Sequence, residues 1–303
     1  MTVASIAAFV SPHGFGHAAR AAAVLAEAHR LSECRVHLFT TAPRWFFEES
    51  LTGIFDYHDV VVDVGFRQRS ALDIDAPATV AALGAHLPFG DALVDRLAAR
   101  VVEAGCSAIL CDVSALGIAV AERAGVPSVL VENFRWSWLY APLLTEHPSL
   151  GAFSAEIDHW IARADRHLQA RPVCERVEGR ELIDPISRGR RLGRAEARAK
   201  LGIDGDGPVV VVTMGGYGED LLFLDGLRAI PETTFVVTGV ERSEKRDNLR
   251  LFDNNTPLFM PDVLGAADAV VAKLGYGTVS EVWKEGLPIA GVTRPNFRSF
   301  TTN

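Results

Sequence analysis

The sequence predicts two α/β domains in tandem, each built on a mostly parallel sheet covered by helices. Short apolar segments alternate with segments whose alanine and leucine residues recur at helical spacing, as in parallel strands joined by helices. The alternation stops in a basic and then glycine- and aspartate-rich stretch at 171–207 and restarts after it. A chain of 303 residues is also long for a single core. We therefore predict one domain over 1–185 and a second over 186–303.

In the first domain, helical periodicity predicts a helix after the first strand, a two-part helical region interrupted near Pro88, and two more helices. A glycine, Gly125, is expected to end the third of these helical regions. The predicted strands are 3–10, 35–41, 55–66, 107–112 and 127–133, and the predicted helices are 17–31, 77–105, 114–125 and 152–170. In the second domain we expect strands at 208–214, 233–239, 248–252, 269–274 and 287–292, with helices at 219–230 and 275–286.

Composition and charge narrow the function classes. Hydrophobic residues make up 49% and charged residues 22%, as in a soluble globular protein. A net charge of −8 argues against nucleic-acid and anionic-membrane partners, because phosphate binding needs a basic face. The four cysteines form no C-x-x-C pair and have no histidine at metal-ligand spacing, so we expect free thiols in a reducing cytoplasm and no metal site. The apolar start lacks a basic n-region, and no uncharged run is long enough to span a membrane.

The loop after the first strand, "SPHGFGHAAR", contains two closely spaced glycines. Gly14, Gly16 and Ala19 match G-x-G-x-x-A, a weak form of the dinucleotide-binding pattern. That pattern also needs an acidic residue at the end of the second strand, where "HLFTTAPRW" has none, so a nicotinamide or flavin cofactor is disfavoured. The glycines still allow a tight turn and the close approach of a ligand.

His17 and Asp112 are the candidate reactive pair. His17 falls in the first turn of a predicted helix, where the helix dipole disfavours imidazolium, so it is suited to act as a general base. The alternative is a capping or structural histidine. Asp112 ends a buried strand whose carboxyl end opens on the same side, where it could orient His17 or instead cap the following helix. Arg20 either contacts a ligand or closes the first turn of the helix.

Two glycine loops in the second domain, "TMGGYGED" and "KLGYGTVSEVW", each join a strand to a helix. Free backbone N–H groups at such a junction favour an anion, and two loops in one domain fit a diphosphate. Neither loop matches the phosphate-binding pattern of P-loop kinases and ATPases. Glu281, one turn into the second helix, could accept both hydroxyls of a ribose or simply pair with the helix N-terminus.

Two further segments have a binding and a packing interpretation. Phe259 and Met260 are expected at a strand end closed by Pro261, where backbone groups could contact the edge of a base. In "VENFRWSWLYAP", Asn133 and the rings of Trp136 and Trp138 could line an acceptor site. For both segments, ordinary core packing is the alternative.

Together these motifs resemble GT-B nucleotide-sugar glycosyltransferases. The resemblance is closest to the group containing the N-acetylglucosaminyltransferase of peptidoglycan synthesis and the UDP-glycosyltransferases, and it is most specific over 257–292. "GFGHAAR" also resembles the opening of the glycosyltransferase-like domain of plant arabinokinases. The resemblance implies two Rossmann-like domains facing a central cleft, the first on the acceptor side and the second binding the nucleotide sugar.

The resemblance also implies roles for individual residues. His17 matches the base that deprotonates an acceptor hydroxyl, which then attacks the anomeric carbon with inversion, and Asp112 matches its partner. Met260 matches the backbone contact to uracil and Glu281 the ribose-binding acid. The donor-binding set is Gly14, Gly16, Gly215, Gly216, Gly218, Met260, Gly275, Gly277, Thr278 and Glu281. The donor, most simply a UDP-sugar, is a substrate, so the resemblance implies neither a cofactor nor a metal.

The resemblance leaves two other functions open. Members of the family continue past "RPNF" with further donor contacts and a long helix, so a chain ending at Asn303 is expected to have a short second domain. The alternatives are a non-catalytic or regulatory module that binds a nucleotide sugar, and a sugar-nucleotide epimerase. UDP binding without transfer would favour the module, and interconversion of the donor sugar without an acceptor would favour the epimerase.

Overall fold

A computed structural model describes residues 4–69, 73–214, 223–254 and 256–292. These residues form two compact units, unit 1 within Met1–Ile186 and unit 2 within Ser187–Pro295. Each unit contains its own sheet, with seven strands in unit 1 and six in unit 2. Both units therefore belong to the α/β class that the sequence predicts.

The sheet of unit 1 is parallel throughout, with strand order β3-β2-β1-β4-β5-β6-β7. From β1 the chain first builds outward to β3, then returns to the other side of β1 and builds outward to β7. The strand order therefore reverses between β1 and β4, which is where ligands bind in open α/β sheets. The strands are β1 (Ser5–Val10), β2 (Arg35–Thr40), β3 (Phe55–Asp59), β4 (Cys106–Asp112), β5 (Ser128–Glu132), β6 (Arg166–Ala170) and β7 (Glu181–Ile183).

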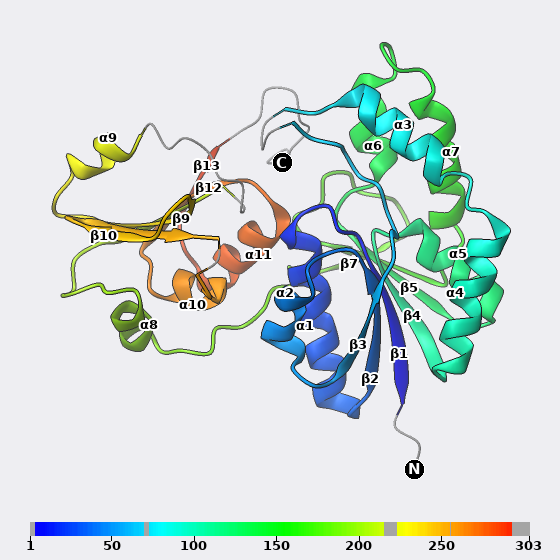
Figure 1. Cartoon of the computed structure of the whole chain (residues 1–303), viewed down its shortest axis with the longest axis horizontal. Helices are drawn as coiled ribbons and strands as arrows, with labels where there is room; N and C mark the ends of the chain where they lie inside the picture. Colours follow the sequence, from blue (N-terminus) through cyan, green and yellow to red (C-terminus); the bar gives the residue numbers. More distant parts are fainter. Residues whose placement is uncertain (1–3, 70–72, 215–222, 255, 293–303) are drawn as a thin grey trace. The chain divides into compact units, whose positions relative to one another are not determined.

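Helices cover both faces of this sheet (Figure 1). The apolar side chains of α1 and α2 pack with β1 and β2 in one core cluster, and those of α3 to α7 form a second, larger cluster. The helices are α1 (Phe15–Ser32), α2 (Arg44–Leu51), α3 (Ala76–His86), α4 (Asp91–Glu103), α5 (Ala115–Ala124), α6 (Trp136–Tyr140) and α7 (Leu150–Ile161), with a 3₁₀ turn, η1 (Ala141–Leu143).

Helix α5 shows how local sequence fixes a helix against the central strands of the sheet. Its N-cap is Ser114, whose Oγ accepts a hydrogen bond from the Gly117 amide at 3.3 Å, and its C-cap is Gly125 in the left-handed conformation. Gly117 packs so closely on the sheet that an added Cβ would lie 2.7 Å from Cys111 Sγ and 2.8 Å from Phe9 Cβ. The start of α5 is therefore fixed against β1 and β4.

Unit 2 has strand order β10-β11-β9-β8-β12-β13, parallel except for the β10–β11 pair. Its order reverses between β8 and β12. One core cluster contains apolar side chains of α8, α10 and α11, and the other includes those of α9. The elements are α8 (Arg194–Lys200), β8 (Val209–Thr213), α9 (Leu224–Arg228), β9 (Thr234–Val240), β10 (Glu244–Arg246), β11 (Leu249–Asp253), α10 (Met260–Gly265), β12 (Ala269–Lys273), α11 (Tyr276–Glu285) and β13 (Ile289–Val292).

Most of the predicted elements are confirmed, including the helical break near Pro88 and the glycine stop at Gly125. Two predictions are wrong in part: the helix predicted over 152–170 ends at Ile161 and is followed by β6, and the strand predicted over 55–66 ends at Asp59. The short strands β7 and β10 and the short helices α2, α6 and α8 are not among the predicted elements. The segment at Phe259 and Met260 is also not a strand end, because Met260 begins α10 with Pro261 in its first turn.

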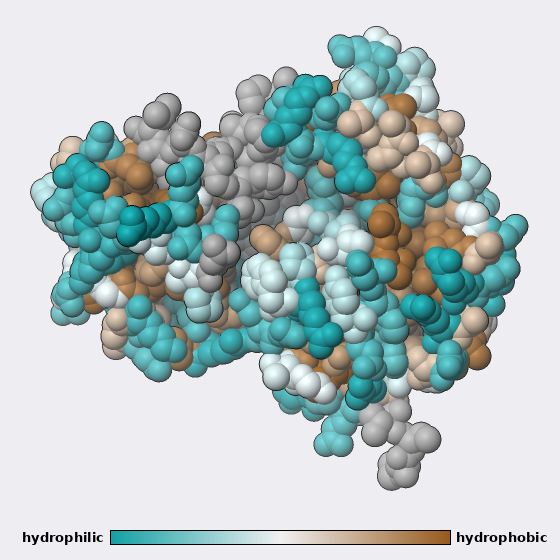
Figure 2. All heavy atoms as spheres, viewed as in Figure 1, coloured by the Kyte–Doolittle hydropathy of each residue, from teal (hydrophilic) through white to brown (hydrophobic). Residues whose placement is uncertain are grey.

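No helix in the described part of the chain is both long and apolar enough to cross a bilayer. In the view of Figure 2, hydrophilic side chains cover much of each unit, with smaller apolar areas between them. The large apolar side chains that are most exposed include Leu31, Val102 and Trp283, which lie on three different helices. Scattered exposure of this kind is normal for a protein surface.

Candidate functional site

The candidate site of unit 1 lies where its strand order reverses. Val10, the last residue of β1, is in register with Asp112, the last residue of β4. After β1 the chain turns at Gly14, whose φ of 88° suits glycine, and enters α1. His17 and Arg20 are in the first two turns of α1, one helical turn apart. The sheet thus brings His17 and Asp112 together from positions 95 residues apart.

His17 and Asp112 form a buried, hydrogen-bonded pair. His17 Nδ1 lies 2.7 Å from Asp112 Oδ1, and the two residues are 6% and 1% exposed. Burial by itself raises the pKa of Asp112, but the charge of Arg20 and hydrogen bonds from His17 and Arg20 outweigh it and lower that pKa. Asp112 is therefore a carboxylate that accepts the Nδ1 proton of His17. Nε2 has no hydrogen-bond partner among the described residues.

The helix caps show that neither residue has the capping role that was its alternative in the sequence. The N-cap of α1 is Gly14, and no side chain of the described residues caps that helix, so His17 is not a capping residue. The helix after β4 is capped by Ser114, so Asp112 is not its cap. Asp112, the last residue of β4, instead lies beside His17 in the first turn of α1.

Arg20 is a buried partner of Asp112, a role that the sequence interpretation did not include. It is 1% exposed, and it donates from Nε to Asp112 Oδ2 at 2.7 Å and from Nη2 to Asp112 Oδ1 at 2.8 Å. Its Nη1 donates to Asn133 Oδ1 at 2.6 Å. Asn133, placed on the acceptor side in the sequence interpretation, is thus a buried partner of Arg20 that follows β5. The pattern H-x-x-R in the first turns of a helix is a signal that could have identified Arg20, because residues three apart share a helix face.

A second buried carboxyl, Asp63, was missed because it lies in the valine-rich run predicted as a strand. Asp63 Oδ2 accepts from Ser11 Oγ at 2.7 Å and from Trp136 Nε1 at 2.7 Å, and Oδ1 accepts from the Val64 amide at 2.9 Å. Burial raises the pKa of Asp63, and these hydrogen bonds only partly offset the effect. An acid within a run of valines is the signal that marks such a position.

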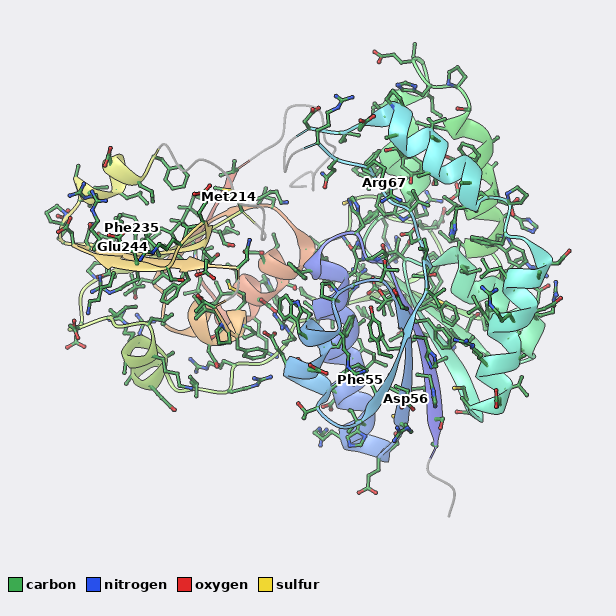
Figure 3. All side chains as sticks on the ribbon, in the orientation of Figure 1. Phe55, Asp56, Arg67, Met214, Phe235 and Glu244 are labelled. Carbon is green, nitrogen blue, oxygen red and sulfur yellow. The ribbon has the colours of Figure 1, made fainter. Side chains whose placement is uncertain are left out.

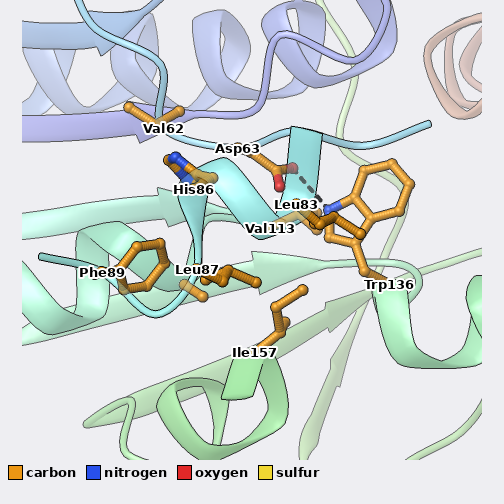
Figure 4. Close-up of a pocket in the computed structure, with 10 residues that line it drawn as sticks. Val62, Asp63, Leu83, His86, Leu87, Phe89, Val113, Trp136 and Ile157 are labelled. Carbon is orange, nitrogen blue, oxygen red and sulfur yellow. Dashed lines mark hydrogen bonds between the residues drawn. The ribbon is translucent and has the colours of Figure 1, made fainter. Parts of the chain in front are cut away.

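Trp136 belongs to the core. It is completely buried, and its ring contacts those of His13, Phe66, Phe134 and Tyr140. It also lines a small cavity with Asp63 and His86 (Figure 4). The cavity measures about 10 Å³, which is room for about one water molecule and not for an acceptor. Of the two interpretations of Trp136, core packing is therefore the one that the structure shows.

The candidate site of unit 2 also lies at its reversal point. Thr213 and Ala272 are paired near the ends of β8 and β12, so these two strands end side by side. Met214, labelled in Figure 3, directly follows β8. The predicted loop glycines Gly215, Gly216 and Gly218 come next and lie outside the described residues.

Helix α11 presents the second glycine loop. Gly275 is its N-cap and has open space where a Cβ would be. Gly277 and Thr278 are in the first turn, which contains no acidic residue. Amide groups in the first turn of a helix have no intrahelical partner and favour an anion. An anion site at this helix start stays a prediction, and the open N-terminal turn is compatible with it.

Glu281 is buried beside this loop and is held by an arginine. It is 5% exposed, and Arg188 donates from Nε to its Oε1 at 3.0 Å. The Arg188 guanidinium carbon also lies 4.8 Å from the centre of the Phe259 ring, next to Met260. Glu281, Arg188 and the start of α10 thus form one cluster. Arg188 was missed because it lies in the basic stretch interpreted as a domain boundary.

In the described residues, no group of three or more histidine, cysteine, aspartate or glutamate side chains is arranged to hold a metal ion.

The chain resembles known proteins in sequence over different lengths. No protein-family model matches it. It is 28% identical over 305 aligned residues to the L-arabinokinase of Arabidopsis thaliana. That alignment covers 95% of this chain and 28% of the arabinokinase. It is 31% identical over 152 residues to the UDP-N-acetylglucosamine–N-acetylmuramyl-(pentapeptide) pyrophosphoryl-undecaprenol N-acetylglucosamine transferase of Paenarthrobacter aurescens, covering 44% of this chain and 41% of that enzyme. The chain thus spans less than half the length of either relative.

Solved structures match nearly the whole chain. The glycotransferase of kitacinnamycin gives a TM-score of 0.61 at 20% identity, over 98% of this chain and 83% of that one. UGT2 of Phytolacca americana, complexed with UDP-2fluoro-glucose and pterostilbene, gives a TM-score of 0.62 at 15% identity, over 96% and 80%. These likenesses show that the chain has the fold of GT-B glycosyltransferases, which confirms the predicted fold class.

Proposed function

We propose that this chain is an inverting glycosyltransferase that moves a sugar from a UDP-sugar to an acceptor hydroxyl. The observation that carries the proposal is the His17–Asp112 pair, with Nδ1 held at 2.7 Å by a carboxylate and Nε2 bonded to none of the residues that the structure describes. A histidine in this state accepts a proton from a hydroxyl placed within hydrogen-bond reach of Nε2. The GT-B fold supports glycosyl transfer, and the name of the N-acetylglucosamine transferase relative supports a nucleotide-sugar donor.

The proposed reaction is a single displacement. His17 Nε2 takes the proton of the acceptor hydroxyl as its oxygen attacks the anomeric carbon of the donor. The bond from that carbon to the diphosphate oxygen breaks, and UDP leaves. Attack from the face opposite the leaving group inverts the configuration. Asp112 stabilises the imidazolium formed at His17 and fixes the tautomer.

Unit 2 is proposed to hold the donor. The first turn of α11, with Gly275, Gly277 and Thr278, would bind the diphosphate through backbone N–H groups and stabilise its growing charge. Glu281 would accept hydrogen bonds from the ribose hydroxyls, with Arg188 holding its Oε1. The backbone of Met260, at the start of α10, would meet the uracil edge. Solved GT-B structures with UDP and with a UDP-sugar analogue bound support the choice of nucleotide.

The setting proposed for this reaction is the reducing cytoplasm. All four cysteines are free thiols, and three of them are buried. Buried, unpaired cysteines are expected where disulfides do not persist.

A nucleotide-sugar-binding module without transferase activity is the second candidate. The observation that favours it is the match of 95% of this chain to 28% of an arabinokinase, a protein named for a different reaction. In that case UDP would bind and no acceptor would be glycosylated.

Calorimetric titration of the full chain with UDP, with ADP and NAD as controls, tests the proposal first. Selective UDP binding is the expected result, followed by transfer from a UDP-sugar in an acceptor screen. UDP binding with at most slow donor hydrolysis would support the module instead, and interconversion of the donor sugar would support an epimerase. No binding of any nucleotide would contradict both donor-based functions.

A further inference from the structure

Arg20 is a buried arginine whose hydrogen bonds converge on the partner of the proposed base. Two of its nitrogens contact both oxygens of Asp112, at 2.7 and 2.8 Å, and a third contacts Asn133 at 2.6 Å. The same side chain places Nη2 3.4 Å from His17 Nδ1. A bidentate contact of this kind orients a carboxylate more rigidly than a single hydrogen bond does.

Because charged groups surround His17, the contact between Arg20 and Asp112 also affects the protonation of the His17 ring. Asp112 carries one negative charge and faces both His17 and the permanent positive charge of Arg20. Asp63, in the segment after β3, also interacts electrostatically with His17. Two neutral side chains also lie here: Asn133 is bonded to Arg20, and the Phe134 ring centroid is 5.6 Å from that of His17.

A carboxylate beside an imidazole normally favours the protonated ring. Here the charge of Asp112 is already balanced by Arg20, so protonating His17 adds a net positive charge to a buried cluster, next to a guanidinium. If Arg20 lost its charge, Asp112 would be balanced by His17 alone, and the ring would retain its proton. A ring that is already protonated at Nε2 cannot accept the proton of an acceptor hydroxyl.

We propose that Arg20 is a positioning residue that keeps His17 uncharged, with the proton on Nδ1 and Nε2 free to act as the base. The proposal rests on the role of His17 in the proposed function. It concerns the free protein, however, so it can be tested without donor or acceptor, and a failure to find glycosyl transfer would leave its test intact.

The test is ¹⁵N NMR of the imidazole nitrogens in ¹⁵N-histidine-labelled protein near neutral pH, with the His17 signals assigned from their loss in His17→Gln. In the unaltered chain, the shifts should show a neutral ring protonated at Nδ1. Arg20→Gln should convert His17 to the doubly protonated ring. Arg20→Lys retains the charge and should retain the neutral ring. Arg30→Gln is the matched control, because Arg30 lies on the same helix but is exposed and paired with Glu27.

A double variant separates charge from structure. Arg20→Gln combined with Asp112→Asn removes both members of the ion pair, which is better tolerated than leaving one buried charge unpaired. His17 should then return to a neutral ring, because the carboxylate that would retain its proton is gone. A purely structural role for Arg20 predicts no such reversal.

Several results would overturn the proposal. They are a protonated or Nε2–H ring in the unaltered chain, an unchanged neutral ring in a folded Arg20→Gln protein, or a protonated ring in Arg20→Lys. If Arg20→Gln does not fold, the unaltered chain, the lysine variant and the double variant decide the matter. Where transfer is measurable, kcat/KM of Arg20→Gln should fall by about tenfold or more at neutral pH and recover as the pH rises, since each pH unit changes the unprotonated fraction tenfold.

Discussion

The carboxyl ends of the two sheets hold buried acids in different surroundings. In unit 1, Asp112 is bonded to a histidine and an arginine from one helix, and the second ring nitrogen of that histidine has no partner in the described part of the chain. In unit 2, Glu281 is bonded to Arg188 beside a glycine-capped helix start. The first arrangement can move a proton and the second can bind an anion and hydroxyl groups. If these sites have the proposed roles, kcat for transfer should respond to substitutions in unit 1 and donor affinity to substitutions in unit 2.

The largest effect is expected at His17. His17→Ala removes the proposed base, so kcat for transfer should fall by about 10²–10⁴-fold. UDP affinity should stay within a few-fold, because a base acts mainly in the transition state. Steady-state kinetics and calorimetry on the same preparation measure both quantities. Loss of UDP binding in a folded His17→Ala protein would contradict the proposal that His17 acts in catalysis and not in donor binding.

The converse pattern is expected at Glu281. Glu281→Gln should weaken UDP binding by about 10–100-fold, since a hydrogen bond to a charged group contributes about 1.5–3 kcal/mol. The kcat at saturating donor should change less. Glu285→Gln is the matched control, because Glu285 lies one turn later on α11 and contacts Arg190 at 3.6 Å. Equal UDP affinity in the glutamine variant of Glu281 and in the unaltered chain would remove Glu281 from the donor site.

The next effect concerns the packing that holds the site of unit 1. Gly117→Ala places a Cβ 2.7 Å from Cys111 Sγ and 2.8 Å from Phe9 Cβ, so α5 must shift from the sheet. Overpacking of this kind should lower the free energy of unfolding by about 1–3 kcal/mol. Gly84→Ala is the control, because its Cβ would meet only Phe153 at 3.5 Å in a helix that favours alanine.

Chemical denaturation measures both glycine variants. Gly117→Ala should also reduce transfer more than UDP binding, since α5 begins three residues after Asp112. If the two alanine variants were equally stable, the close packing of α5 would not control the site of unit 1.

Sequence patterns predicted His17, Asp112 and Glu281 because each follows a strand that alternates with helices, and strand ends converge at one edge. They could not show that Arg20 and Arg188 are buried partners of these acids, because an arginine among other polar residues has the same local pattern whether it is exposed or buried. Only the folded sheets show that Arg20 meets a strand 92 residues away and Arg188 a helix 93 residues away.

The same limit explains the errors in the fold. The segment 152–170 has helical periodicity in its first part, but the short strand at Arg166–Ala170 is specified by pairing with β5, which the segment itself does not encode. Trp136 was ambiguous for a related reason. Aromatic residues after a strand suit an acceptor surface and a core equally, and the difference lies in the rings that surround them.

The smallest effect is expected in the pH dependence of stability, where the two buried aspartates of unit 1, Asp112 and Asp63, should differ in sign. Asp112 has a pKa below its ordinary value, so it contributes stability above the unfolded pKa, and that contribution is lost as pH falls through the folded pKa. Asp63 has a pKa raised by burial, so its effect has the opposite sign. The protonated form is favoured in the folded state, and stability is lost as pH rises through the folded pKa.

Asparagine variants should reveal these opposite signs. As pH rises from about 3 to about 7, Asp112→Asn should become progressively less stable relative to the unaltered chain, and Asp63→Asn progressively more stable, each by about 1 kcal/mol or more for each unit of pKa shift removed. Urea unfolding at several pH values gives both differences, and any constant change in packing cancels from the slope. If Asp112→Asn instead became more stable relative to the unaltered chain as pH rises, Arg20 would not compensate the charge of Asp112. That result would contradict the proposal that Arg20 keeps His17 uncharged, and it needs no measurement of sugar transfer.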